Sequence, residues 1–145
     1  MQAPMGKPAY WLIKSEPSAY SFSQLEKEKR TAWTGVRNFE ARNNIRSMHP
    51  GDLALYYHSG EGKEIVGVAR VVSEPVGDPT APGEDWASVQ VEPVIALRNP
   101  VTLAQMKAAR ELADFPLVTR SRLSVAPVRA EHFRKVLELG NTRLP

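Results

Sequence analysis

The sequence predicts an α+β fold, in which a small mixed β-sheet curls into a barrel and helices surround it. Three observations support this prediction. Short runs of β-forming residues are separated by segments with helical periodicity or helix-capping residues. The predicted strands require both hairpin and crossover connections. The chain of 145 residues is long enough to bury a core and suggests one domain, residues 1–145.

The N-terminal half contains one predicted strand and two predicted helices. The run at 10–14 is apolar and rich in β-forming residues, which is typical of a buried strand. Ser21 can cap a short helix, because a glutamine follows three positions later. Asn38 is a candidate N-cap for a second helix, on which Arg42 and Arg46 share a face because they are four positions apart.

The middle of the chain reads as three strands and one long loop. Segments 53–58 and 64–72 predict a hairpin across a glycine-containing loop, and the second is apolar on both faces, as in a central strand. Segment 73–85 is rich in proline, glycine and acids, which is typical of a loop. A strand at 86–97 then alternates apolar and polar residues, and Pro93 indicates a bulge or a sheet edge.

The C-terminal part predicts a helix, a short extended segment and a closing helix. Thr102 can cap a helix that covers 102–115. Segment 120–128 predicts a short strand, and 129–140 predicts an amphipathic surface helix that carries His132 and ends at Gly140. Its apolar stripe consists of Phe133, Val136 and Leu137.

Composition excludes several classes of protein. The longest apolar runs fall far short of the roughly 20 residues that cross a bilayer. The N-terminal segment has no apolar signal-peptide core. The chain has no cysteine, which excludes disulfides and thiol catalysis and fits a reducing compartment. We therefore expect a cytoplasmic protein with no membrane partner.

Charge is unevenly distributed along the chain, although the net charge is only +3. Segment 29–46 has five bases and one acid, and segment 120–135 has the same balance. Segment 73–93 has five acids and no base. Basic segments that met in space would attract a polyanion, whereas scattered solvated charges would not.

Motifs of common enzyme classes are absent from the sequence. There is no P-loop, no GxGxxG after a strand, no HExxH and no GxSxG. The three histidines lie far apart, so we expect neither a metal site nor a cofactor. His58 and Ser59 with Glu16 could serve hydrolysis, but their spacing does not support it.

Polar and aromatic residues coincide at the ends of the predicted segments. They lie at 14–16, 33–38, 56–59 and 120–124. If these ends converge, they form a pocket with aromatic walls and a polar floor, which suits a flat heterocycle. Polar groups would contact the edge of the ring, while arginines hold phosphate outside. Each residue also has a purely structural explanation, such as a core position for Trp33.

Five segments resemble the EVE domain family, which includes many small bacterial proteins. They are "YWLIKSEPS", "WTGVRNFEARNNIR", "GDLALYYHS", "GVARVVSEP" and "SRLSVAPV", in the family's order, and the resemblance covers about residues 9–140. It implies a PUA-like fold, a mixed pseudobarrel of about five to six strands with flanking helices. It also implies recognition of a modified base in nucleic acid, by a pocket built from the matching segments. Those segments contain Lys14, Ser15, Glu16, Trp33, Gly35, Val36, Arg37, Asn38, Tyr57, His58, Ser59, Ser121, Arg122, Leu123 and Ser124.

We interpret the protein as a noncatalytic module, expected to be monomeric, that binds DNA or RNA carrying a modified base such as a modified cytosine. A base flipped out of a duplex could enter the pocket. Trp33 would form an aromatic wall, and Glu16, Asn38 and Ser124 would contact the base edge. Phosphates would be contacted by Arg37, Arg42, Arg46 and Arg122.

Two alternatives remain open at this point. The first is an enzyme that acts on a modified nucleoside or nucleotide and uses Glu16 and His58 as acid and base. The second is a small-ligand sensor that uses the same pocket without binding a polymer.

Overall fold

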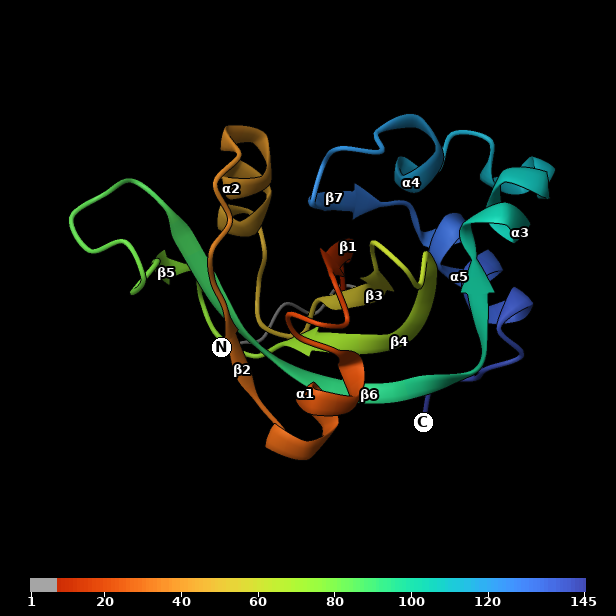
Figure 1. The fold of residues 1–145 in the computed structure, drawn as a ribbon, viewed down its shortest axis with the longest axis horizontal. Coiled ribbons are helices and arrows are strands. Elements are labelled where there is room, and N and C mark those ends of the chain that lie inside the picture. Colours follow the sequence, from red (N-terminus) through yellow and green to blue (C-terminus); the bar gives the residue numbers. More distant parts are fainter. Residues whose placement is uncertain (1–7) are drawn as a thin grey trace.

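The computed structural model describes residues 8–145, in which a strongly curled sheet is flanked by helices (Figure 1). The strands are β1 Tyr10–Ser15, β2 Thr31–Trp33, β3 Leu53–His58, β4 Glu64–Val71, β5 Val76–Gly77, β6 Ala87–Thr102 and β7 Val125–Val128. The helices are α1 Phe22–Glu28, α2 Phe39–Arg46, α3 Leu103–Ala108, α4 Pro116–Thr119 and α5 Ala130–Leu139, with a 3-10 turn at Arg110–Leu112. The predicted α+β class is confirmed.

The strand order in the sheet is β2-β6-β4-β3-β1-β7, and the short β5 pairs with β6. β1 and β3 are parallel, with Tyr10 opposite Leu53, whereas all other pairs are antiparallel. The predicted hairpin of 53–58 and 64–72 is present, and β4 is a central strand as its apolar pattern indicated. β2 and β7 are therefore the two edge strands of the curled sheet.

β6 is longer than the predicted strand at 86–97, because it continues to Thr102. Its pairing with β4 shifts register twice. One shift lies where Val68 pairs with Ile95 but Ala69 pairs with Pro93, so the predicted bulge at Pro93 is confirmed. Proline cannot donate to the ladder, which makes a bulge the favoured local solution.

Helix starts follow their predicted caps, but α3 is shorter than predicted. The Ser21 hydroxyl accepts from the Gln24 amide at 3.0 Å, and Thr102 forms a capping box at the start of α3. α3 ends at Ala108, followed by the 3-10 turn and α4, so the prediction of one helix over 102–115 is wrong. Phe115 adopts an extended conformation, as expected of a residue that precedes a proline.

α5 carries the predicted apolar stripe, but one of its residues differs from expectation. His132 is buried and packs edge-on against Phe115, so its placement on the outer surface is wrong. Gly140 ends the helix, and a Cβ there would lie 3.1 Å from the Asn99 carbonyl oxygen. A side chain at 140 would crowd Asn99, and the left-handed conformation that often follows a helix is adopted by Asn141 instead.

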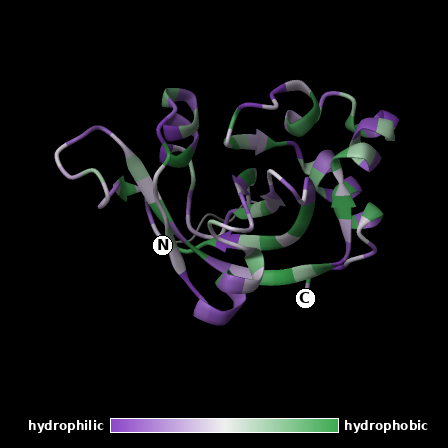
Figure 2. Ribbon diagram, in the orientation of Figure 1, coloured by the Kyte–Doolittle hydropathy of each residue, from purple (hydrophilic) through white to green (hydrophobic). Residues whose placement is uncertain are grey.

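The hydrophobic core lies inside the curl of the sheet. In Figure 2 hydrophobic residues concentrate along β4 and β6, while α1 is mostly hydrophilic. α1 contributes Phe22 and Leu25 to this core. A Cβ on Gly67 would lie only 2.5 Å from the Phe22 ring, so α1 packs directly against β4 at this glycine. None of the helices in residues 8–145 combines the length and apolar character of a membrane span.

Candidate functional site

A pocket of about 510 Å³ lies at the seam between the end of β1 and the edge strand β2. Its volume falls in the usual range for small-ligand pockets. Strand β2 forms one wall, and the turn into α2 continues that wall. The pocket is lined by Lys14, Ser15, Ala19, Tyr20, Thr31, Ala32, Trp33, Thr34, Gly35, Val36, Arg37, Asn38 and Ser124.

Sheet topology explains why residues far apart in sequence line one pocket. β2 and β7 are opposite edges of the sheet, and the curl brings the β2 edge towards the β1–β7 side. The Lys14 amide donates to the Ser124 carbonyl at 3.2 Å, which joins two segments more than a hundred residues apart. Eight of the predicted site residues line the pocket: Lys14, Ser15, Trp33, Gly35, Val36, Arg37, Asn38 and Ser124.

Three other predicted residues line an adjoining groove of about 290 Å³. Ser121, Arg122 and Leu123 lie there beside Asn38, which borders both cavities. The Lys14 ammonium donates to the Ser121 carbonyl at 2.9 Å and links the two cavities. The pocket and the groove therefore adjoin at Asn38.

The last four predicted residues support the pocket wall instead of lining the pocket. Tyr57 is buried on β3 opposite Lys14, and the Ser59 amide donates to the Ser15 carbonyl at 3.0 Å. The His58 Nε2 atom accepts from the Phe22 amide at 3.1 Å. Glu16 lies against the β3–β4 loop, with its carboxylate 3.0 Å from the Cβ position of Gly60.

Glu16 and His58 are poorly placed for an acid–base pair acting on a ligand in the pocket. Neither residue belongs to its lining, and the His58 ring already accepts a backbone hydrogen bond. Burial lowers the pKa of His58, an effect that nearby Glu64 partly opposes. The imidazole therefore serves as a neutral structural acceptor at the start of α1.

Trp33 belongs to both the core and the pocket wall. It is only 8% exposed and makes edge contacts with Tyr20 and Tyr56, at centroid distances of 6.5 and 5.3 Å. The Tyr56 hydroxyl donates to the Tyr20 carbonyl at 2.6 Å, and burial raises the Tyr56 pKa well above its usual value. The Trp33 ring is thus held in one orientation while part of it borders the cavity.

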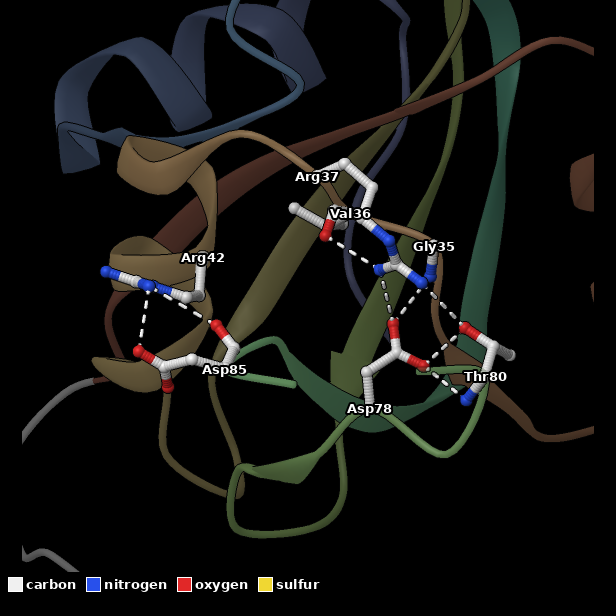
Figure 3. Close-up of polar contacts among 7 residues, drawn as sticks. All are labelled: Gly35, Val36, Arg37, Arg42, Asp78, Thr80 and Asp85. Atoms are coloured by element: carbon white, nitrogen blue, oxygen red, sulfur yellow. Dashed lines mark hydrogen bonds and ion pairs between the residues drawn. The ribbon is translucent and has the colours of Figure 1, made fainter. Parts of the chain in front are cut away.

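The segment between β2 and α2 is fixed by Asp78 from the acidic loop (Figure 3). Gly35 has a φ of +81° and donates its amide to Asp78 at 2.8 Å. Arg37 donates to the same carboxylate oxygen at 3.0 Å, and Thr80 donates through its amide and hydroxyl to the other oxygen. Asp78 therefore uses both carboxylate oxygens to hold the pocket rim.

The electrostatics of Asp78 follow from these contacts. Burial by itself would raise the carboxyl pKa, but the hydrogen bonds from Thr80, Gly35 and Arg37 outweigh it and lower the pKa far below its usual value. The carboxylate stays ionised at neutral pH. Sequence reasoning treated Asp78 as one of several loop acids, and only the buried cluster of donors distinguishes it.

The charged segments meet in space, and part of their charge is neutralised. Arg42 and Arg46 both pair with Asp85 from the acidic loop. Arg120 pairs with Glu40 at 2.6 Å, so the second basic segment contacts the start of α2. Fewer arginines and lysines are therefore unpaired than the number of basic residues in these two segments indicates.

The pocket itself keeps a positive character. Its lining includes Lys14 and Arg37 but no aspartate or glutamate. Burial lowers the pKa of Lys14. Neither Lys14 nor Arg122 forms an ion pair with a carboxylate in the described part of the chain. These two cations can therefore accept an anionic partner without breaking an existing salt bridge.

Sequence reasoning also missed strand β2 and part of the pocket. β2 has only three residues, and it pairs only with β6, with Trp33 opposite Val89. The run "TAWT" contains β-forming residues that could have indicated it. The lining residues missed were Ala19, Tyr20, Thr31, Ala32 and Thr34.

Comparisons with known proteins agree with this fold. Mouse thymocyte nuclear protein 1 is 34% identical over 167 residues, a match that covers 92% of this chain and 74% of that protein. The structure of Rpa0253 from Rhodopseudomonas palustris has 47% identity and a TM-score of 0.88, covering 92% of this chain and 93% of that one. Human THYN1 protein, solved in complex with 5-methylcytosine-containing DNA, has 30% identity and a TM-score of 0.86, covering 93% and 99%.

The family assignment rests on the whole chain and not on isolated motifs. A model of the EVE domain family matches residues 9–139. The curled mixed sheet with its flanking helices is the PUA-like fold that the resemblance implied. The protein belongs to the EVE domain family.

Proposed function

We propose that the protein is a noncatalytic nucleic-acid-binding module that reads a modified cytosine in DNA. One observation carries this proposal: an aromatic, positively charged pocket lies at the seam of a fold shared with a human relative that was solved with 5-methylcytosine-containing DNA. A base inside a duplex cannot reach such a pocket, so the target base must be unpaired or flipped out.

The pocket offers contacts for both the face and the edge of a base. Trp33 and Tyr20 supply aromatic surface. Asn38 caps α2 by accepting from the Ala41 amide at 2.9 Å through Oδ1. Its Nδ2 group makes no hydrogen bond within residues 8–145, and Asn38 is one of the lining residues of the pocket. Asn38 can therefore be a helix cap and, at the same time, donate to a base acceptor.

Phosphate contacts would come from cations around the pocket and the groove. Lys14 and Arg122 are available without rearrangement, as described above. Arg37, Arg42 and Arg46 would have to share or exchange their carboxylate partners, because each is already paired. We retain all four predicted arginines as candidates. Affinity should then fall steeply with salt, since each neutralised phosphate releases counterions.

A binding panel tests this proposal. Oligonucleotides that differ only at one cytosine, unmodified or 5-methylated, are titrated by fluorescence anisotropy at two salt concentrations. We expect the modified strand to bind more tightly at both salt concentrations. Contacts with the base in the pocket contribute to the binding free energy, and salt screens them far less than it screens phosphate contacts. Equal dissociation constants for the two strands would refute recognition of the modification.

Asn38→Asp is a matched test of the pocket, because aspartate caps a helix about as well as asparagine. The variant should fold with wild-type stability but lose the Nδ2 donor and place a negative charge beside the base. We expect preference for the modified strand to fall by about tenfold, the effect of roughly 1.4 kcal/mol. An unchanged preference would mean that Asn38 acts only as a cap.

A further inference from the structure

Phe39 is a large apolar side chain that the fold leaves in water. It is 66% exposed, and its ring stacks on Trp86 at a centroid distance of 5.3 Å and an interplanar angle of 11°. Phe39 is the first residue of α2, and Trp86 immediately precedes β6. We call this pair the Phe39–Trp86 platform. Phe39 therefore keeps exposed apolar surface although its ring already contacts Trp86.

Two arginines contact the platform, and each is also paired with an aspartate of the acidic loop. The Arg42 guanidinium lies 5.0 Å from the Phe39 ring centroid and 5.9 Å from that of Trp86. The Arg37 guanidinium lies 5.5 Å from the Trp86 centroid. Figure 3 shows both side chains beside the 78–85 loop that leads into Trp86. An exposed aromatic pair with guanidinium groups over its rings suits a flat ring on an anionic backbone.

The platform is also adjacent to the pocket. Asn38, which lines the pocket, directly precedes Phe39, and bonded neighbours in the chain have Cα atoms about 3.8 Å apart. Arg37 belongs to both places, since it lines the pocket and contacts Trp86. The pocket and the platform therefore adjoin at the start of α2, where a strand with one base in the pocket would pass the platform.

We propose that the Phe39–Trp86 platform stacks the base that flanks the modified cytosine on the same strand. This inference rests on the proposed function and extends it from one base to a dinucleotide. Arg37, which lines the pocket and contacts Trp86, is then the candidate contact for the phosphate that joins the two bases, and it would share its pairing with Asp78. Stacking accepts any base, so the flanking position contributes affinity without strict sequence preference. The ligand is a locally unstacked strand and not a free nucleoside.

Substitution of Phe39 tests the platform. Loss of one base–aromatic stack corresponds to about a 5- to 150-fold weaker affinity. Phe39→Ala should therefore weaken binding of a 5-methylcytosine-containing single strand by at least about fivefold, whereas Phe39→Tyr should bind like the wild type. Val76→Ala is the matched control, because Val76 is 60% exposed on β5. Thermal unfolding should show that all three variants remain folded.

Strands with an abasic site on either side of the cytosine give the decisive comparison. The wild type should lose affinity when the flanking base is missing, and Phe39→Ala should show no further loss. The idea is overturned if Phe39→Ala binds the intact strand like the wild type, or if the abasic sites weaken both proteins equally. A change only in oligomeric state would identify the platform as a protein contact and would also overturn it.

The same measurements separate this inference from the proposed function. If the wild type does not prefer the methylated strand, the proposal that the protein recognises the modification fails. The affinities of Phe39→Ala and of the wild type for intact and abasic unmodified strands still test the platform. If the methylated strand is preferred but Phe39→Ala has no effect, only the platform fails. If no oligonucleotide binds, both proposals fail.

Discussion

Asp78→Asn should be the most damaging single-atom change at the pocket rim. The wild-type carboxylate accepts from Gly35 and Arg37 on one oxygen and from Thr80 twice on the other, at 2.6 to 3.0 Å. Asparagine keeps the shape, but its NH₂ group must face one of these donor pairs. Facing Gly35 and Arg37, the NH₂ group opposes two donors. Facing Thr80, it opposes the backbone amide, whereas the Thr80 hydroxyl can turn and accept from it.

The size of the effect follows from at least one lost bond and from the weaker bonds that a neutral amide oxygen accepts in place of a carboxylate. Hydrogen bonds to a charged group contribute about 1.5–3 kcal/mol each, and Arg37 recovers part of its loss through water because its side chain is 41% exposed. We therefore expect a loss of about 2–4 kcal/mol in the free energy of unfolding at pH 7. For a chain of this length that corresponds to a fall of about 5–15 °C in the melting temperature.

Urea and thermal unfolding of three proteins check this value. Asp85→Asn is the control, because it is the same substitution on the same loop but its carboxylate is 75% exposed and screened by water. It should change stability far less than Asp78→Asn. The reasoning fails if the two variants are equally stable, since the buried cluster would then carry no special stabilisation.

The pH dependence provides an independent test of the same carboxylate. The pKa of Asp78 is lowered in the folded state, so its stabilisation is present above the unfolded value of about 3.9 and is lost as pH falls towards the folded value. The stability difference between wild type and Asp78→Asn should therefore be constant near neutral pH and narrow below about pH 4. A difference that does not change across this acidic range would contradict the assignment.

Two glycine substitutions test the packing and the turn, both by thermal unfolding. Gly67→Ala should cost about 1–3 kcal/mol or more, because the new methyl would lie 2.5 Å from the Phe22 ring, whereas Gly77→Ala meets no atom within 4 Å and should be tolerated. Equal stability of these two variants would contradict the packing of α1 on β4. Gly35→Ala should cost about 1–2 kcal/mol from its φ of +81° alone, since its Cβ also meets no atom within 4 Å. Gly35→Asn should cost less, because asparagine tolerates that conformation, and the reverse order would show that conformational strain is not the cause.

Much of the fold could be predicted because its signals are local. Ser21, Asn38 and Thr102 cap helices as predicted, and their side-chain oxygens reach amides three positions away. The β3–β4 hairpin and the bulge at Pro93 follow from short-range backbone chemistry. β2 was missed because three residues carry little periodicity and depend on β6 for their pairing.

Predicting the candidate site was harder, because its residues lie at segment ends in several parts of the chain. The sequence identified the β1 end, the segment before α2, and Ser124, and these line the pocket. It did not separate lining residues from supporting residues. Ser15 and His58 are register partners on adjacent strands, yet only Ser15 borders the cavity.

The sequence by itself therefore determined most of the elements, their caps, the family and the main segments of the candidate site. The tertiary structure decided which charges are free and which are neutralised. Arg42 and Arg46 lie four positions apart, as read from the sequence, but only the folded acidic loop shows that Asp85 pairs with both. Likewise, only folding buries Asp78 beneath Gly35 and Arg37. Caps depend on neighbours within one turn of chain, whereas these ion pairs depend on how a curled sheet brings distant loops together.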